Sequence, residues 1–118
     1  MSRDYRLYLN DILQAIAKIN GYVQGQTLDQ FKADSLTIDA VALNLMIIGE
    51  ASRNIPDEIQ RQYPAVDWRN IVGLRNIITH EYFRLNLDRI WNVIEVELPL
   101  LRDHISNILE DNAGDEED

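Results

Sequence analysis

The chain has 118 residues, and 20 acidic against 11 basic side chains give it a formal net charge of −9. That length fits one compact domain with a substantial core. The absence of cysteine excludes a disulfide scaffold, a Cys-ligated metal centre and thiol catalysis, and two histidines are too few for a multi-histidine metal site. Early charged residues and short apolar runs indicate no secretory leader and no membrane span, so we expect a soluble cytoplasmic domain.

The negative charge is unevenly distributed along the chain. Six of the 20 acids lie in residues 110–118, and the remainder carries 14 acids against 11 bases. Nine of the bases are arginines, and seven of these fall between residues 53 and 102. Arginine pairs bidentately with phosphates or carboxylates, so the cluster could grip RNA or could pair with neighbouring acids on solvated helix faces. Composition is therefore silent on RNA binding, and both interpretations stay open.

Helices are predicted throughout, because prolines and glycines are few and no strand-like alternation occurs. The first helix covers about residues 3–20, with an apolar stripe at three- and four-residue steps. Asn20-Gly21 is its expected stop, since both residues tolerate a left-handed cap. A capping box at Thr27–Gln30 predicts a short second helix ending near Asp34.

The third helix, residues 36–54, is apolar on nearly every side and is expected at the centre of a bundle. Gly49 lacks a Cβ atom and would let another helix approach closely. Glu50 follows it directly, and a buried carboxylate needs a partner, for which we expect an arginine from another helix.

Three further helices are expected: residues 56–63, residues 68–83 capped by Asp67, and residues 87–110 capped by Asn86. Pro99 removes a backbone donor from the last one and should bend it near residues 95–98. The predicted fold is thus an all-α bundle of about five helices in a single domain, residues 1–110. Residues 111–118 are expected to form a disordered acidic tail.

The residues that could carry chemistry concentrate in residues 73–82. His80 is suited to proton transfer near neutral pH, and Arg75 is a permanent cation shaped to grip phosphate. RNA cleavage without a metal needs a base, an acid and a cation for the phosphorane charge, which such residues could supply. The same residues could equally serve as a helix C-terminal dipole partner and ordinary packing.

Helix geometry sets a condition on this chemistry. Positions five apart, such as Arg75 and His80, are displaced by about 140° around the axis and about 7.5 Å along it. Asn76 and His80 share one face, and Arg75 and Tyr82 share another. Arg75 and His80 would therefore meet at one phosphate only if the arginine wraps around, the helix distorts, or a two-fold dimer supplies a shared cleft. We favour the dimer.

Arg75-x4-His80-Glu81-Tyr82 resembles the Arg-x4-His-x-Tyr signature of HepT-like toxins in the HEPN superfamily. Three further segments resemble the same family: residues 11–16, residues 48–51 and residues 67–76. The likeness covers about residues 4–109, and only the acidic tail departs from it.

The resemblance implies an all-α homodimer acting as a metal-independent endoribonuclease toxin of a type VII-like toxin–antitoxin pair, with no cofactor. Arg75 and His80 would be the catalytic pair, and Asn76 would orient them. Apart from the resemblance, Glu50 could be a supporting carboxylate that orients Arg75 or Arg69, or it could form a purely structural buried pair. The partner implied is a minimal nucleotidyltransferase antitoxin, which would neutralise the toxin by transferring AMP from ATP to Tyr82. AMP adds bulk and negative charge where an RNA phosphate would bind.

Two alternatives stay open. The chain could be a non-catalytic helical subunit that docks a nucleotidyltransferase or presents a nucleotide to it, which would need only Tyr82 and its surroundings. It could also be a plain helical dimerisation module in which the motif arose by chance. His104 lies outside any polar constellation and is interpreted as an exposed helix residue.

Overall fold

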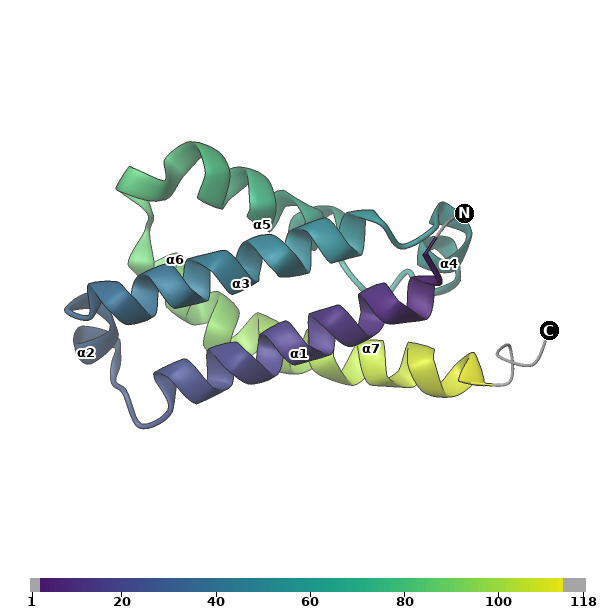
Figure 1. Cartoon of the computed structure of the whole chain (residues 1–118), viewed down its shortest axis with the longest axis horizontal. Coiled ribbons are helices and arrows are strands. Elements are labelled where there is room, and N and C mark those ends of the chain that lie inside the picture. The colour runs from purple at the N-terminus through teal and green to yellow at the C-terminus, as the bar shows by residue number, and fades with distance from the viewer. Residues whose placement is uncertain (1–2, 114–118) are drawn as a thin grey trace.

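The computed structural model describes residues 3–113, and all regular structure in that range is helical (Figure 1). The elements are α1 (Tyr5–Val23), α2 (Leu28–Lys32), α3 (Ser35–Arg53), α4 (Asp57–Gln62), α5 (Trp68–Glu81), η1 (Tyr82–Arg84), α6 (Leu87–Asn92), η2 (Val93–Glu97) and α7 (Leu98–Asp111). The predicted all-α class is confirmed. The elements outnumber the five or so helices expected, because the last predicted helix is divided into three elements and residues 82–84 form the separate element η1.

Three of the predicted helix starts are confirmed by their caps. Thr27 and Gln30 form the reciprocal capping box at the start of α2. The Asp67 carboxylate accepts a hydrogen bond from the Asn70 backbone amide at 3.3 Å, and the Asn86 side chain accepts one from the Arg89 backbone amide at 3.2 Å. These side chains satisfy backbone donors that the first turn of a helix leaves free.

The predicted end of the first helix at Asn20-Gly21 is wrong, because α1 continues to Val23. Val23 is the next member of the apolar stripe and is buried, so another turn of helix gains core contacts. The chain turns instead at Gly25, whose φ of +79° is a left-handed conformation that glycine adopts without steric cost.

The predicted last helix is divided into α6, the π-helical segment η2 and α7. Pro99 has no amide hydrogen and stands in the first turn of α7. Just before it, the Leu98 amide bonds to the Val93 carbonyl, five residues back. The π-helical turn, which is wider than an α-helical one, therefore places the irregular backbone hydrogen bonds next to Pro99, the residue that cannot donate. At the other end α7 reaches Asp111, and residues 114–118 of the predicted tail lie outside the described residues.

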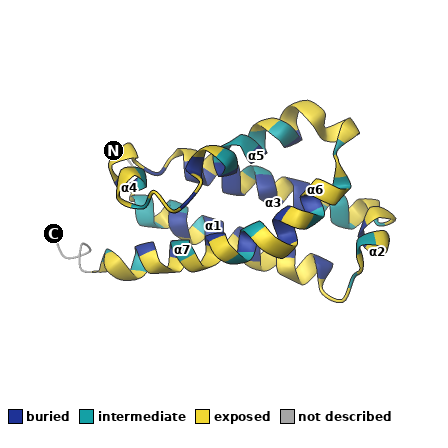
Figure 2. Ribbon diagram, turned by 180° about the vertical axis from the view of Figure 1, so that it is seen from behind, coloured by how far each residue is buried: buried dark blue, intermediate teal, exposed yellow. Residues whose placement is uncertain are grey.

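The central helix is α3, which packs against α1 on one side and α5 on the other, while α7 packs along α1 (Figure 1). By length and composition alone α3 is apolar enough to cross a membrane. Its buried side chains, however, belong to the common core that it shares with α1, α5 and α7 (Figure 2). The buried polar side chain Asn44 donates to the Ala40 carbonyl at 2.9 Å within the same helix.

Gly49 brings α3 and α5 into close contact, as its missing Cβ predicts. A Cβ atom at this position would lie 2.9 Å from the Arg75 backbone nitrogen and 3.0 Å from the Arg75 Cβ. It would also lie 3.2 Å from the Val72 carbonyl oxygen. The backbone of α5 therefore rests directly on α3 at the position of Arg75.

We expect Gly49→Ala to destabilise the protein, although alanine is the better helix former. The clash involves backbone, which cannot rotate away, and overpacking of this kind costs about 1–3 kcal/mol. The helix-propensity gain of about 1 kcal/mol offsets only part of that cost. The measurement is the free energy of unfolding by urea titration.

Gly21→Ala is the matched control, because a Cβ at Gly21 in α1 meets nothing within 4 Å. This variant should be as stable as the parent or more so. Equal stabilisation by both substitutions would show that α3 and α5 do not need the close contact.

Candidate active site

The burial of α5 fixes where its remaining side chains point. Ile71, Leu74 and Ile78 are buried against the core at three- and four-residue steps. The helix extends from Trp68 to Glu81 and departs from helical backbone angles only at Glu81, so each of the remaining positions up to His80 has a defined direction around the axis. One flank of α5 faces α3, and the opposite, outer surface faces solvent.

The flank beside α3 holds Arg75 and Tyr82, the pair that the sequence placed on one face. The Arg75 Nε atom lies 3.0 Å from the Glu50 Oε2 atom, and the Tyr82 hydroxyl donates to the Asp39 carboxylate. The expected arginine partner of Glu50 is therefore present. The pair is not buried, since the Arg75 and Glu50 side chains are 41% and 49% exposed. Exposed ion pairs contribute about 1 kcal/mol at most, so a phosphate can displace Glu50 from Arg75.

Asp39 is the residue of this site that sequence reasoning missed. It lies 43 positions before Tyr82 and belongs to no recognisable motif. Only the antiparallel packing of α3 against α5 brings its carboxylate to the tyrosine hydroxyl. Its spacing of eleven residues from Glu50, about three helical turns, is the one sequence signal that both acids share a face of α3.

Arg75 and His80 are not brought together within one chain. The backbone of α5 leaves the helical conformation only at Glu81, whose φ and ψ are −125° and 18°. This change lies after His80, so no distortion of the helix between Arg75 and His80 brings the two side chains together in the described residues. Arg75 extends toward Glu50 on α3, whereas His80 is exposed. On a regular helix the two side chains are about 140° apart around the axis. For both side chains to contact one phosphate, the arginine would have to swing away from Glu50, or a second chain would have to supply one of the two residues.

The outer surface of α5 carries Asn76 and His80, again as the spacing predicts. Both side chains are exposed, and neither makes a hydrogen bond or ion pair within residues 3–113. The imidazole is thus free to exchange protons with a bound molecule. A surface hollow lies next to the imidazole and is lined by His80, Glu81, Phe83 and Arg84.

The sequence left open whether the arginines of residues 53–102 pair with neighbouring acids or are free to grip RNA, and the structure shows arginines in both states. Within the described residues, Arg53 and Arg75 contact Glu50, and Arg102 contacts Asp103. The other guanidinium groups of residues 53–102 make no ion pair there: Arg61, Arg69, Arg84 and Arg89. Arg69 and Arg84 lie at the two ends of α5, so free cations flank the exposed histidine.

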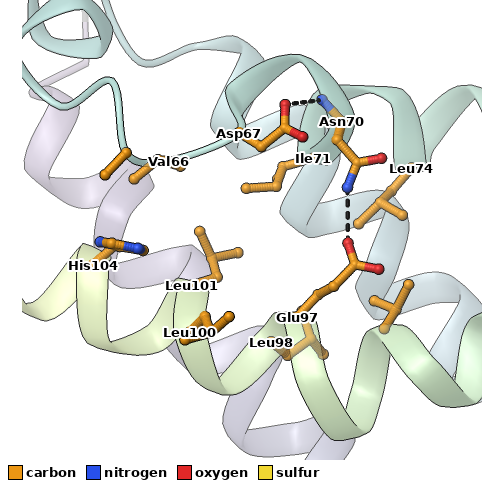
Figure 3. A pocket seen from close by; sticks show the side chains of 12 residues that line it. Val66, Asp67, Asn70, Ile71, Leu74, Glu97, Leu98, Leu100, Leu101 and His104 are labelled. Carbon is orange, nitrogen blue, oxygen red and sulfur yellow. Dashed lines mark hydrogen bonds between the residues drawn. The ribbon is translucent and has the colours of Figure 1, made fainter.

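A separate apolar cavity of about 230 Å³ lies on the α7 side of α5 (Figure 3). At its rim lies the Asn70 side-chain amide, which donates a hydrogen bond to the Glu97 carboxylate at 2.8 Å. His104 lies across the cavity from this pair and is partly buried, rather than fully exposed as the sequence suggested. Since Arg75 and His80 lie on other faces of α5, the cavity does not belong to the candidate active site.

No group of three His, Asp or Glu side chains in residues 3–113 could hold a metal ion.

The comparisons with known proteins give the same family that the sequence resembles. The chain matches the family model described as ribonuclease HepT-like over residues 12–108. It is 34% identical over 115 residues to a Methanocaldococcus jannaschii protein named as a putative RNase, covering 98% of this chain and 95% of that protein. It is 34% identical over 102 residues to a Thermococcus cleftensis protein named "Probable ribonuclease HepT", covering 86% of this chain and 93% of that protein.

A longer relative is also found. A Methanocaldococcus jannaschii protein named as a gamma-glutamylcyclotransferase and putative RNase is 34% identical over 111 residues, which is 94% of this chain. The match spans only half of that protein's length. No solved structure matches the chain at a significant level.

Proposed function

Because the chain belongs to the HepT-like ribonuclease family, we propose that it is a metal-independent endoribonuclease in which Arg75 and His80 carry out the reaction. The observation that carries the proposal is the state of His80, which is exposed and has no partner within the described residues. Imidazole is the side chain used most often as a general acid–base, and an exposed one can reach a bound substrate. Five residues earlier on α5 lies Arg75, a cation whose ion-pair partner among the described residues is the exposed carboxylate of Glu50.

The proposed reaction needs no group from outside the protein and its RNA. The ribose 2′-oxygen attacks the adjacent phosphorus, and the P–O5′ bond breaks. His80 takes the 2′-hydroxyl proton and a proton is returned to the departing 5′-oxygen, which leaves a cyclic phosphate and a 5′-hydroxyl. Arg75 stabilises the negative charge that builds up on the phosphoryl oxygens. Asn76, one turn before His80 on the same face, would orient the imidazole or the phosphate.

Glu50 would have a positioning role. In the free protein its carboxylate fixes the Arg75 guanidinium against α3. RNA binding would exchange this carboxylate for a phosphate, and Glu50 would limit how far Arg75 can move. A carboxylate beside the cation also disfavours binding of stray anions, because they must compete for Arg75.

A second copy of the chain would bring Arg75 and His80 to a common phosphate. The exposed face of α3 carries Leu36, Leu43 and Ile47 at spacings of seven and four residues, next to Glu50 and Asp39. An apolar stripe on one helix is self-complementary in a two-fold dimer, in which the same face meets itself. Such packing would place two copies of the Arg75 flank side by side, so that each active site could use residues of both chains.

We further propose that the chain is the toxin of a cytoplasmic toxin–antitoxin pair and that a nucleotidyltransferase adds AMP to Tyr82. Tyr82 is 38% exposed, and its hydroxyl donates to the Asp39 carboxylate. Transfer of AMP would replace that hydrogen bond with repulsion between a phosphodiester and a carboxylate. The modified tyrosine would leave α3 and occupy the space beside Arg75, where RNA would bind.

The alternative function is a non-catalytic subunit that docks a nucleotidyltransferase. The contact of Arg75 with Glu50, and its separation from His80 around the helix, favour this alternative in the isolated chain. It differs from the nuclease in needing Tyr82 but neither Arg75 nor His80.

Cleavage in the presence of EDTA separates the two functions. We expect the purified chain to cut RNA, and His80→Ala to slow cleavage by about 10²- to 10⁴-fold, the usual effect of losing a general acid–base. Arg75→Ala should cause a loss of similar size. His104→Ala is the matched control, because this histidine lies on α7 beside the apolar cavity and should cut at the parental rate. Activity retained by both site variants would reject Arg75 and His80 as the catalytic pair. No cleavage despite intact partner binding would favour the scaffold.

Modification can be tested by mass spectrometry of the chain co-expressed with a neighbouring nucleotidyltransferase. We expect AMP on the parent chain and none on Tyr82→Phe. Tyr22→Phe should be modified like the parent, because Tyr22 is similarly exposed but lies on α1. AMP found on another residue, with Tyr82 unmodified, would reject the assigned acceptor.

Dimerisation through α3 is tested by sedimentation velocity. We expect Leu43→Glu to sediment as a monomer at concentrations at which the parent is a dimer, because the substitution buries a charge in an apolar contact. Leu7→Glu, an equivalent change on the exposed part of α1, should leave the dimer intact. If Leu43→Glu remains dimeric, another surface joins the two chains.

A further inference from the structure

The outer surface of α5 carries more than the histidine that the reaction uses. Arg69, Gly73, Asn76 and His80 follow one another at steps of four, three and four residues. On a regular helix these positions lie within about 60° of one another around the axis. They form one stripe on the side turned away from the buried Ile71, Leu74 and Ile78.

The stripe is open along its length. Gly73 has no side chain, and a Cβ atom there would meet nothing within 4 Å. Arg69, Gly73 and Asn76 are among the residues that line one shallow hollow, and His80, Glu81, Phe83 and Arg84 line the next. The stripe, which we call the α5 track, thus consists of Arg69, Gly73, Asn76 and His80 and ends at Phe83 and Arg84. Figure 2 shows the C-terminal part of α5 as predominantly exposed.

Phe83 is the most unusual member of the track. Its side chain is 97% exposed, the highest value among the large hydrophobic residues of the described chain. The ring is held on one side by Tyr82, because the Phe83 and Tyr82 rings meet in a T-shaped contact with centroids 5.3 Å apart. An aromatic ring held at a turn with free space around it offers its faces to another planar group.

The charges along the track fit a nucleic-acid strand better than an apolar ligand. Arg69 and Arg84 stand at its ends, and neither makes an ion pair within residues 3–113. Glu81 is the acid that lines the Phe83 hollow. Its carboxylate repels phosphate but accepts hydrogen bonds from base N–H groups, so a base rather than the backbone would lie against it.

We propose that the α5 track binds a short unpaired stretch of RNA, with one base stacked on Phe83 and phosphates on Arg84 and Arg69. The proposal rests on the proposed nuclease function and adds its substrate class, which is single-stranded RNA read from the His80 side of α5. From Arg69 to Arg84 the track is about 20 Å long, enough for a few nucleotides. A cationic path with a stacking ring is the usual means of holding single strands without sequence readout.

The test is binding of a fluorescent 2′-O-methyl RNA oligonucleotide to the full chain, measured by anisotropy. The methyl group blocks the attacking 2′-oxygen, so binding is measured whether or not the chain is a nuclease. Phe83→Ala should weaken binding by roughly 5- to 100-fold, the usual loss of one stacked base. Phe83→Trp should restore it, and a duplex of the same sequence should bind more weakly because its bases are not free to stack.

The two arginines are tested through salt. Arg69→Ala and Arg84→Ala should each weaken binding and lower the slope of log K against log salt by about 0.7, the value for one phosphate contact on a single strand. Arg102→Ala is the control, because this arginine lies on α7 beside Asp103 and should keep the parental affinity and slope.

The outcomes distinguish this proposal from the proposed function. Parental binding by Phe83→Ala overturns the track, even if the chain cleaves RNA. Loss of dimerisation in Phe83→Ala by sedimentation also overturns it, since the ring would then be covered by a second copy. Single-strand binding that depends on Phe83 and both arginines supports the track, even if no cleavage is detected and the nuclease function fails.

Discussion

The contact between α3 and α5 at Gly49 is the constraint on which the rest of the site depends. With no side chain at Gly49, the backbone of α5 reaches α3 at Val72 and Arg75. This contact sets both the distance between the helices and the rotation of α5 about its axis. The rotation then decides which residues of the motif meet α3 and which face solvent.

The rotation gives the three sides of α5 different environments. Ile71, Leu74 and Ile78 enter the core. Arg75 and Tyr82 meet the acids Glu50 and Asp39 of α3. Asn76 and His80 face outward without partners among the described residues. One side of α5 thus stabilises the fold, a second holds the arginine and the tyrosine in place, and the third is open to a bound molecule.

An acidic protein can still present a cationic surface to RNA. The overall charge of −9 includes the acids of residues 110–118, far along the chain from α5. Locally, carboxylates from α3 hold the Arg75 and Tyr82 flank, whereas Arg69 and Arg84 remain unpaired within the described residues. The proposed binding of phosphate would depend more on this local arrangement than on the net charge, because screening limits the reach of an exposed charge to about 10 Å.

The sequence by itself determined the helical class, the helix starts and the faces of α5. Thr27, Asp67 and Asn86 cap helices as expected, because capping depends on a side chain and the amides two or three residues ahead. The pairing of Arg75 with Tyr82, and of Asn76 with His80, follows from helical periodicity alone. The stop at Asn20-Gly21 was predicted wrongly because burial of Val23 outweighed a local cap signal.

Tertiary structure alone decided which groups from distant parts of the chain meet. Asp39 reaches Tyr82, and Glu50 takes Arg75, because two helices far apart in sequence pack antiparallel in one register. That register is set by the shape of the shared core and by the missing side chain of Gly49, and neither leaves a local pattern for Asp39. Local rules govern hydrogen bonds within a few residues, whereas contacts across forty residues depend on how whole surfaces fit together.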